Sequence, residues 1–329
     1  MSWIALIPIL VVGLSSFAGA KVTNLKTLPE KRLFIRKNPN QKITRPGSYT
    51  GTLKDGGHDR YYLVHIPAKY RPSVPTPLVF ILHGGGGNMR YQANDEYYKL
   101  ITKSEKAGFI AVFPNGFTKL SSGKLATWNA GKCCGDSRDQ KIDEVGFLKK
   151  TFEAVKKELN IDEKKVFSIG MSNGGMMSYR LACEAPNIFK GIAAVAGTDN
   201  TINCDPSTPT NILHIHAKDD SIVKFDGGIG KDVPDPTQVN DFTSVATTIA
   251  KWVKINGCVQ TPKRVLQQQG AYCDLYSGCK NDVKVQLCVT ETGGHSWPGG
   301  KKASESRPIN QGITANDVIW DFFTQKSVK

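Results

Sequence analysis

A serine at position 172 stands between two glycines in the segment SIGMSNGGMMSY, which spans residues 168–179. The pattern Gly170-x-Ser172-x-Gly174 suits a nucleophile, because flanking glycines let a sharp turn push the central side chain outward. The residues VFSIG before the turn are typical of a buried strand, and NGGMMSYRLA after it begins a helix pattern. We therefore expect Ser172 to attack an electrophilic carbonyl carbon.

A serine nucleophile needs a histidine base, and in enzymes with this turn the acid and then the histidine follow the serine along the chain. Of the six histidines, three precede Ser172. His214 and His216 lie on the strand before the expected acid, so they precede it in the chain. His295 alone remains, in the glycine-rich loop TGGHSWPGG directly after a strand pattern. This order predicts His295 as the base.

The acid of such a triad is expected directly after the strand pattern NILHIHA, which ends at residue 217. Asp219 and Asp220 are the first candidates there, and Asp226 is a weaker one. Spacing does not choose between the first two. One of them is predicted to be a plain solvated carboxylate.

Two backbone N–H groups are needed to stabilise the negative oxygen that forms during acyl transfer. One is expected from Asn173, the residue after the nucleophile, and one from the glycine run HGGGG at residues 83–87, most directly Gly85. Glycine allows the backbone to approach a substrate closely. This chemistry requires neither a metal nor an organic cofactor.

Strand and helix patterns alternate along the chain and would position these residues. Strands are predicted at residues 60–67, 77–83, 108–114, 164–170, 188–197, 210–217 and 282–291. Helices are predicted at residues 91–106, 143–159, 176–183, 241–255 and 313–323, and residues 115–141 are read as irregular. The alternation predicts the α/β class, with a mostly parallel sheet and helices on both faces.

The first twenty residues are uncharged and apolar, and they end in Ala18-Gly19-Ala20, a small-residue cleavage pattern. They predict a signal peptide at residues 1–20 and hence a secreted protein, whether extracellular or periplasmic. An uncleaved anchor is the alternative, but Pro8 and Gly13 interrupt a stretch that is already short for a span. No second apolar span is found in the sequence, so no membrane-spanning segment is expected.

Half of the net charge of +14 gathers at residues 21–46, where eight basic residues stand against Glu30 alone. This basic arm is read as a solvated tail, or as a weak contact with anionic surfaces. No nucleic-acid recognition motif is present, so nucleic acid is not an expected partner. Residues 47–329 are predicted to form a single catalytic domain.

Eight cysteines follow the predicted signal peptide. An even number in an oxidising compartment favours disulfide bonds over free thiols. Eight cysteines allow 105 full pairings, so the sequence does not assign the partners.

Six ordered segments together resemble the secreted polyhydroxybutyrate depolymerase and feruloyl esterase family of α/β-hydrolases: LHGGGGN, WNAGKCC, GMSNGGMMSYRLA, HAKDDSIV, GGHSWPGG and NDVIWDFF. The resemblance covers residues 47–323. It implies an α/β-hydrolase fold, and it implies a serine esterase acting on feruloyl or acetyl polysaccharide esters or on hydroxyalkanoate oligomers. It also implies a triad of Ser172, Asp220 and His295.

The same resemblance places Trp128 and Trp297 near the substrate cleft, and packing inside the protein is the alternative for both. It further implies that Cys133 and Cys134 take part in at least one disulfide that braces their loop.

Two other functions stay open on the sequence. His214-x-His216 followed by two aspartates is similar to part of a metallohydrolase site, although no third histidine is adjacent. A non-catalytic binding module on a hydrolase scaffold is the second, because a fold does not determine a function.

Overall fold

The computed structural model describes residues 31–32, 45–239, 241–301 and 308–325. The predicted signal peptide, and the basic arm apart from residues 31–32 and 45–46, lie outside these described residues. Within the described ranges, no helix is both long enough and apolar enough to cross a bilayer.

The described part of the chain contains one eleven-stranded sheet, in the spatial order β1-β2-β3-β5-β4-β6-β7-β8-β11-β10-β9. The strands are β1 (Lys31–Arg32), β2 (Gly47–Asp55), β3 (His58–Ile66), β4 (Thr76–Leu82), β5 (Ile110–Pro114), β6 (Ile161–Met171), β7 (Gly191–Val195), β8 (Asn211–Ala217), β9 (Lys263–Gln268), β10 (Ala271–Tyr276) and β11 (Val285–Thr290). The six central strands from β5 to β11 are parallel, and antiparallel pairs flank them on both sides. The predicted mostly parallel sheet is confirmed.

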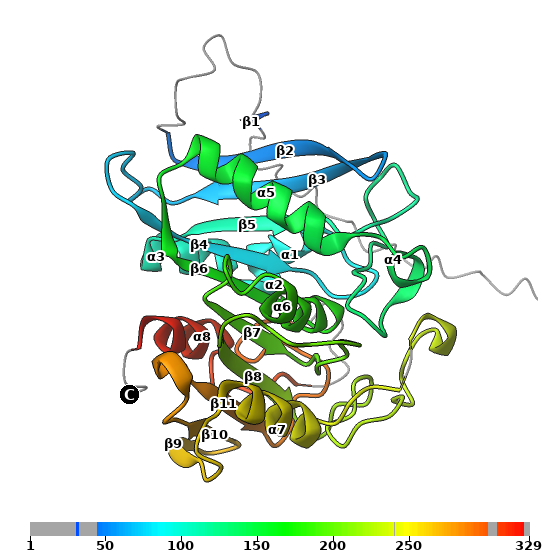
Figure 1. Cartoon of the computed structure of the whole chain (residues 1–329). Helices are drawn as coiled ribbons and strands as arrows, with labels where there is room; N and C mark the ends of the chain where they lie inside the picture. The colour runs from blue at the N-terminus through cyan, green and yellow to red at the C-terminus, as the bar shows by residue number, and fades with distance from the viewer. Residues whose placement is uncertain (1–30, 33–44, 240, 302–307, 326–329) are drawn as a thin grey trace, which may run out of the picture.

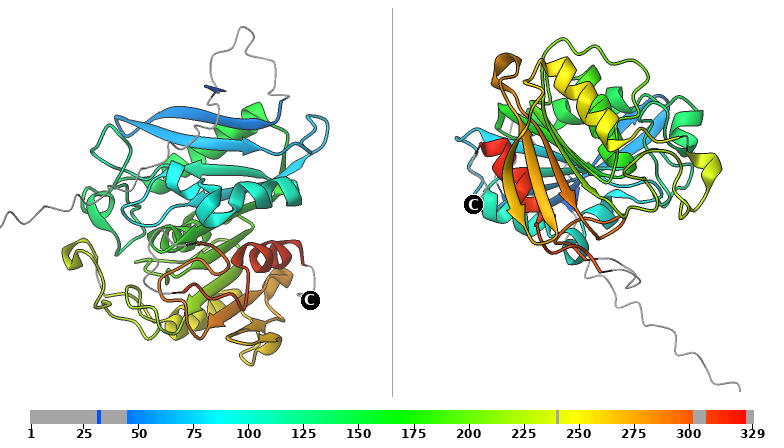
Figure 2. Two further views of the ribbon diagram at one scale, coloured as in Figure 1. Left: turned by 180° about the vertical axis from the view of Figure 1, so that it is seen from behind. Right: turned by 90° about the horizontal axis from the view of Figure 1, so that it is seen from below.

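Helices cover both faces of this sheet (Figures 1 and 2). They are α1 (Met89–Gln92), α2 (Asp95–Tyr98), α3 (Leu100–Ala107), α4 (Gly135–Asp139), α5 (Glu144–Glu158), α6 (Asn173–Glu184), α7 (Val245–Asn256) and α8 (Ala315–Thr324), with 3-10 turns η1 (Pro236–Gln238) and η2 (Lys280–Asp282). Helices α5, α6 and α7 lie on one face, and α3 and α8 lie on the other (Figure 1).

Alternate residues of the central strands face two separate cores, as a pleated strand requires. Phe80 on β4 packs in the core that contains Met177 of α6, whereas its neighbour Ile81 packs in the core that contains Ile319 of α8. A strand buried on both faces reads as a continuous apolar run, which is why β4 was predictable from its sequence.

The predicted single helix at residues 91–106 is wrong, because the structure divides this segment into α1, α2 and α3. Asn94 stops the first helix and caps the second by accepting a hydrogen bond from the Glu96 N–H. Lys99 then adopts a left-handed conformation with φ of 52° and separates α2 from α3. The polar capping residues outweigh the apolar periodicity here.

All eight cysteines are paired in the described structure, which confirms the expected disulfides. The pairs are Cys133–Cys134, Cys183–Cys204, Cys258–Cys279 and Cys273–Cys288. Three of these bonds join residues that are 15 to 21 positions apart, and Cys133 bonds to its direct neighbour.

Candidate active site

Ser172 occupies the turn between the end of β6 and the start of α6. Its backbone has φ of 54° and ψ of −124°, a conformation that residues other than glycine rarely adopt. The Ser172 N–H donates to the Val195 carbonyl oxygen at 2.8 Å, which ties the turn to the neighbouring strand β7. A strained residue held in place by its surroundings is characteristic of a functional site.

The glycines of the motif are required by close backbone contacts. A Cβ atom on Gly170 would lie 2.3 Å from the Gly174 carbonyl group, and a Cβ atom on Gly174 would lie 2.3 Å from the Leu82 oxygen. Gly197, two residues after β7, is equally crowded, because its Cβ would lie 2.2 Å from the Ser172 backbone carbonyl oxygen. The sequence pattern therefore reflects a turn packed against the ends of β4 and β7.

His295 lies in the loop after β11 and contacts the carboxylate of Asp220, in the turn after β8. The distance from His295 Nδ1 to Asp220 Oδ2 is 2.8 Å, and the carboxylate is fully buried while the imidazole is partly exposed. Asp220 Oδ1 accepts hydrogen bonds from the backbone N–H groups of Ile222 and Val223 at 2.9 and 3.0 Å. Asp220 is thus held from both of its oxygens.

The pKa of the Asp220 carboxyl lies well below its ordinary value. Burial alone would raise this pKa, but the charge of His295 and hydrogen bonds from His216 and His295 outweigh the burial. Because Asp220 is therefore a carboxylate, His295 Nδ1 must be the donor in their hydrogen bond. In the neutral ring, Nε2 is then left with a free lone pair that can take a proton.

The structure separates the aspartates that spacing left open. Asp219 is exposed and its Oδ1 accepts a hydrogen bond from the Gly294 N–H at 2.7 Å, so it holds the loop rather than the imidazole. Asp226 makes no hydrogen bond to His295 within the described residues. Asp220 is the carboxylate that the structure brings to His295.

Ser172, Asp220 and His295, called here the candidate triad, all follow parallel strands. Their strands β6, β8 and β11 lie in the consecutive series β6-β7-β8-β11, so the three residues emerge at the same edge of the sheet. In the described structure, no hydrogen bond joins the Ser172 hydroxyl to His295. Such contacts are commonly long in ligand-free enzymes and shorten when substrate binds.

The glycine run after β4 lies directly against the serine turn. A Cβ on Gly84 would lie 3.5 Å from the Ser172 Cβ, and a Cβ on Gly85 would lie 3.6 Å from the Asn173 Cβ. The Gly87 N–H donates to the Gly84 oxygen within the loop, and the Gly86 N–H donates to the Ala126 oxygen, whereas the Gly85 N–H meets no acceptor among the described residues. Asn173 is the first residue of α6, where a backbone N–H has no acceptor within the helix.

The Asn173 side chain has a role that the sequence did not indicate. Its Oδ1 accepts from the Trp128 N–H at 2.7 Å, and its Nδ2 donates to the Trp128 oxygen at 2.9 Å. The Trp128 indole N–H in turn donates to the His83 oxygen at 2.9 Å. These bonds connect the start of α6, the end of β4 and the irregular segment into one unit.

Both tryptophans expected near the cleft are buried. Trp128 has no exposed surface, and Trp297 packs edge-on against Tyr98 while its indole N–H donates to Asn316. Their burial favours the packing alternative, and a direct contact of either ring with substrate stays a prediction.

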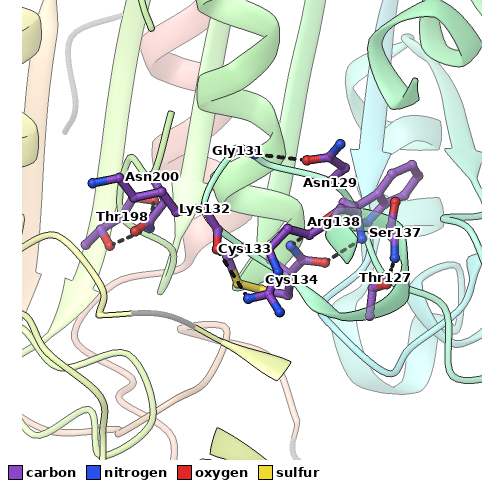
Figure 3. The surroundings of a disulfide bond; sticks show 12 residues. Thr127, Asn129, Gly131, Lys132, Cys133, Cys134, Ser137, Arg138, Thr198 and Asn200 are labelled. Atoms are coloured by element: carbon purple, nitrogen blue, oxygen red, sulfur yellow. Dashed lines mark hydrogen bonds between the residues drawn. A yellow bond between two sulfur atoms is a disulfide. The ribbon is translucent and has the colours of Figure 1, made fainter. Parts of the chain in front are cut away.

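A tight loop at residues 128–134 contains the disulfide between the adjacent cysteines (Figure 3). The Cys134 N–H donates to the Trp128 oxygen at 3.0 Å, and the Lys132 N–H donates to the Asn200 oxygen at 3.0 Å. A bond between neighbours cross-links no two distant elements, so its effect is local to this loop. The loop supports Trp128, to which Asn173 is hydrogen bonded.

His83 is a second residue that the sequence did not single out, although it opens the glycine run. It is fully buried, accepts from the Gly116 N–H at Nε2, and has Nδ1 2.8 Å from the Gly84 oxygen. Since a carbonyl oxygen only accepts, Nδ1 must be the donor and the ring is neutral. Burial, with a smaller effect of the Arg60 charge, lowers the pKa of His83 to about 4.

The histidines of the metallohydrolase alternative are both buried on β8. His214 Nδ1 lies 2.8 Å from the Tyr179 hydroxyl, His214 Nε2 lies 3.0 Å from His216 Nδ1, and His216 Nε2 lies 2.7 Å from the Val223 oxygen. Every ring nitrogen thus faces a protein atom. Within the described ranges, no three His, Cys, Asp or Glu side chains gather as a metal site would require.

Residues 55–256 match the family model described as "Putative esterase". Feruloyl esterase C of Emericella nidulans is 29% identical over 272 residues, which cover 80% of this chain and 83% of that protein. Feruloyl esterase B of Piromyces equi is 27% identical over 252 residues, and the match spans 74% of this chain but only 44% of the Piromyces protein. These matches do not support the polyhydroxybutyrate part of the expected resemblance.

Solved structures show the fold. The acetyl xylan esterase from Aspergillus awamori has a TM-score of 0.57 at 14% identity, covering 84% of this chain and 98% of that one. An S-formylglutathione hydrolase from Agrobacterium tumefaciens has a TM-score of 0.50 at 13% identity, covering 78% of this chain and 91% of that one. The expected α/β-hydrolase fold is confirmed, and the chain belongs to the esterase family whose model it matches, as a carboxylic-ester hydrolase.

Proposed function

We propose that the chain hydrolyses carboxylic esters through an acyl-enzyme on Ser172, with His295 as base and Asp220 as the group that orients it. The observation that supports this most strongly is the hydrogen bond from His295 to the buried Asp220 carboxylate, at the sheet edge where Ser172 turns. It leaves the imidazole in the tautomer that a general base needs.

The reaction proceeds in two halves. Ser172 Oγ attacks the ester carbonyl carbon while His295 Nε2 takes its proton, and Asp220 stabilises the imidazolium that forms. The N–H groups of Asn173 and Gly85 donate to the oxyanion. The alcohol leaves with the proton from His295. A water molecule then gives a proton to His295 and attacks the acyl carbon, and the acid is released as Ser172 Oγ takes the proton back.

Feruloyl esters on polysaccharide are the substrate class that we propose first, because relatives at 27–29% identity are named as feruloyl esterases. Acetyl polysaccharide esters and hydroxyalkanoate oligomers are the other substrates that fit the same chemistry. We further propose that the protein is secreted, since four disulfides suit an oxidising compartment. N-terminal sequencing of the exported protein should then begin at Lys21.

Labelling with a fluorophosphonate probe, followed by peptide mapping, tests the nucleophile directly. We expect the label on Ser172 and none in the Ser172→Ala variant, whose ester hydrolysis should fall by about 10⁶-fold. If folded, disulfide-intact protein takes no label, the triad is not assembled and the binding-module alternative is favoured.

Rates on a panel of soluble esters then test the substrate class. Methyl ferulate, an acetylated xylo-oligosaccharide and a hydroxybutyrate dimer present different acyl groups to the same triad. A higher kcat/KM for methyl ferulate supports the feruloyl class, and a preference for either of the others overturns it.

A further inference from the structure

Behind the candidate triad, three buried polar side chains form a continuous row of hydrogen bonds that leads from α6 to Asp220. Tyr179 of α6 lies 2.8 Å from His214, and His214 lies 3.0 Å from His216, both on β8. His216 Nε2 lies 3.3 Å from Asp220 Oδ2, the oxygen that also receives the hydrogen bond from His295. The three side chains are inaccessible to solvent, with at most 1% exposed surface.

The direction of these hydrogen bonds follows from their two ends. His216 Nε2 faces two groups that only accept, the Val223 carbonyl oxygen and the Asp220 carboxylate, so it must hold a proton. At the other end, the Tyr179 hydroxyl has His214 as its hydrogen-bond partner within the described residues. A phenol that only accepted from His214 would leave a buried O–H without an acceptor, at a cost of about 1–3 kcal/mol.

The arrangement that satisfies every group has both rings neutral. Tyr179 O–H donates to His214 Nδ1, His214 Nε2–H donates to His216 Nδ1, and His216 Nε2–H points to Val223 and Asp220. Burial keeps the pKa of His214 well below its ordinary value, in agreement with a neutral ring. Each donor therefore fixes the tautomer of the next ring.

We propose that His216 is a positioning residue for Asp220, and that His214 and Tyr179 fix the ring that performs this role. The proposal rests on the ester hydrolysis proposed above. Asp220 receives two backbone N–H groups at Oδ1, and His216 shares Oδ2 with His295. The Nε2–H of His216 holds the plane of the carboxylate and takes part of the negative charge that would otherwise act on His295 alone. No proton moves along the row.

The charged groups that face this row are few in the described structure. Asp220 and His295 lie at one end. At the other end, Asp199 acts on Tyr179 and is paired with Lys251 at 2.7 Å. Replacing His216 should therefore act mainly on the protonation of His295.

The test is the pH profile of kcat/KM on a soluble aryl ester for His216→Leu, His216→Gln and Tyr179→Phe. Leucine removes the donor, so Asp220 draws the proton of His295 more strongly and the rising limb moves to higher pH. We expect a shift of about half a unit to one unit and a 10- to 100-fold lower kcat/KM, roughly the effect of one hydrogen bond to a charged group. Glutamine, whose amide replaces the donor, should restore both.

Tyr179→Phe keeps the ring stacked on Trp252 and removes only the hydroxyl. It should move the limb in the same direction by a smaller amount. Circular dichroism of each variant over the same pH range shows whether it stays folded, so that only a shift of the limb in folded enzyme is counted. If His216→Leu does not fold, Tyr179→Phe decides the question alone.

A matched control is His65→Gln, which alters another buried histidine, on β3, and should leave the limb in place. Fluorophosphonate labelling separates the two proposals. If the unaltered protein is not labelled at Ser172, the proposed function fails. If it is labelled but the limb stays in place in both His216→Leu and Tyr179→Phe, only the role of His216 is overturned.

Discussion

The candidate triad has a counterpart near the other edge of the sheet, at strands β2 and β3. It consists of Ser48, His65 and Glu105. Ser48 on β2 lies opposite His65 on β3, and its hydroxyl is 2.9 Å from the ring. His65 is 2.8 Å from the Glu105 carboxylate on α3. The chemical groups are the same, but here Nδ1 faces the serine and Nε2 faces the acid.

The difference between the two groups lies in the backbone around the serine. Ser48 is buried in a regular antiparallel pair of strands. Ser172 has positive φ, precedes the first N–H groups of α6, and lies so near the glycine run that a Cβ on Gly84 would be 3.5 Å from the Ser172 Cβ. A hydrogen-bonded row of serine, histidine and carboxylate is therefore not sufficient for acyl transfer. The turn and the unpaired N–H groups beside it supply what the second group lacks.

The largest expected effect among variants of the acids and buried histidines comes from neutralising the two acids in turn. Asp220→Asn removes the charge that fixes the His295 tautomer, so we expect kcat to fall by about 10⁴-fold. Glu105→Gln changes the same chemical group beside His65 and should leave kcat within about twofold of the unaltered enzyme. Steady-state kinetics on one aryl ester measures both, with circular dichroism to confirm folding. A comparable loss in Glu105→Gln would mean that the two groups are not separate.

A smaller effect, on stability, is expected from the buried histidine below the glycine run. His83 is neutral in the fold with a pKa of about 4, whereas the unfolded chain binds this proton near pH 6.5. Acid therefore favours the unfolded state, and the stability that neutral His83 contributes is lost as the pH falls from about 6.5 to about 4. We expect a loss of about 2–3 kcal/mol in the free energy of unfolding over this range.

The His83→Gln variant isolates this contribution, because glutamine keeps a donor and an acceptor and does not titrate. Urea unfolding of the two proteins is measured from pH 7 to pH 4. In the difference between their free energies of unfolding, the contributions of other titrating groups cancel, including that of Glu144, whose pKa is raised by burial. Equal pH dependence in both proteins would contradict a neutral His83.

The sequence predicted the parts of the site that depend on local sterics and chain order. Ser172 was identifiable because crowded turns need glycine, and His295 because no other histidine follows the acid. Asp219 and Asp220 could not be separated by spacing, since both lie in one turn and only their contacts in the loop after β11 distinguish them. The bonds from Asn173 to Trp128 join residues 45 positions apart and leave no local pattern.

The fold was predicted best where strands are buried on both faces. Strands β4 and β5 are continuous apolar runs, but β2 and the edge hairpin of β9 and β10 were missed. In this hairpin β9 (KRVLQQ) is largely exposed and polar, whereas β10 (AYCDLY) is buried or half-buried but has Asp274 in its middle. Neither strand shows a continuous apolar run or a regular alternation.

The smallest expected changes in stability come from removing the hydroxyl of Ser48 or of Ser172, and their order is the reverse of the order of the two variants' effects on hydrolysis. Ser48→Ala leaves Nδ1 of the buried His65 without its partner, so we expect the free energy of unfolding to fall by about 1 kcal/mol while ester hydrolysis is unchanged. Ser172→Ala is expected to lose nearly all ester hydrolysis. The Ser172 hydroxyl makes no hydrogen bond within the described residues, so the free energy of unfolding of this variant should change by less than about 0.5 kcal/mol. Urea unfolding measures the stability of both variants, and ester hydrolysis measures their activity. If Ser172→Ala is the less stable of the two, the Ser172 hydroxyl is bound into the fold, and it is then less free to act as a nucleophile than the geometry of the turn implies.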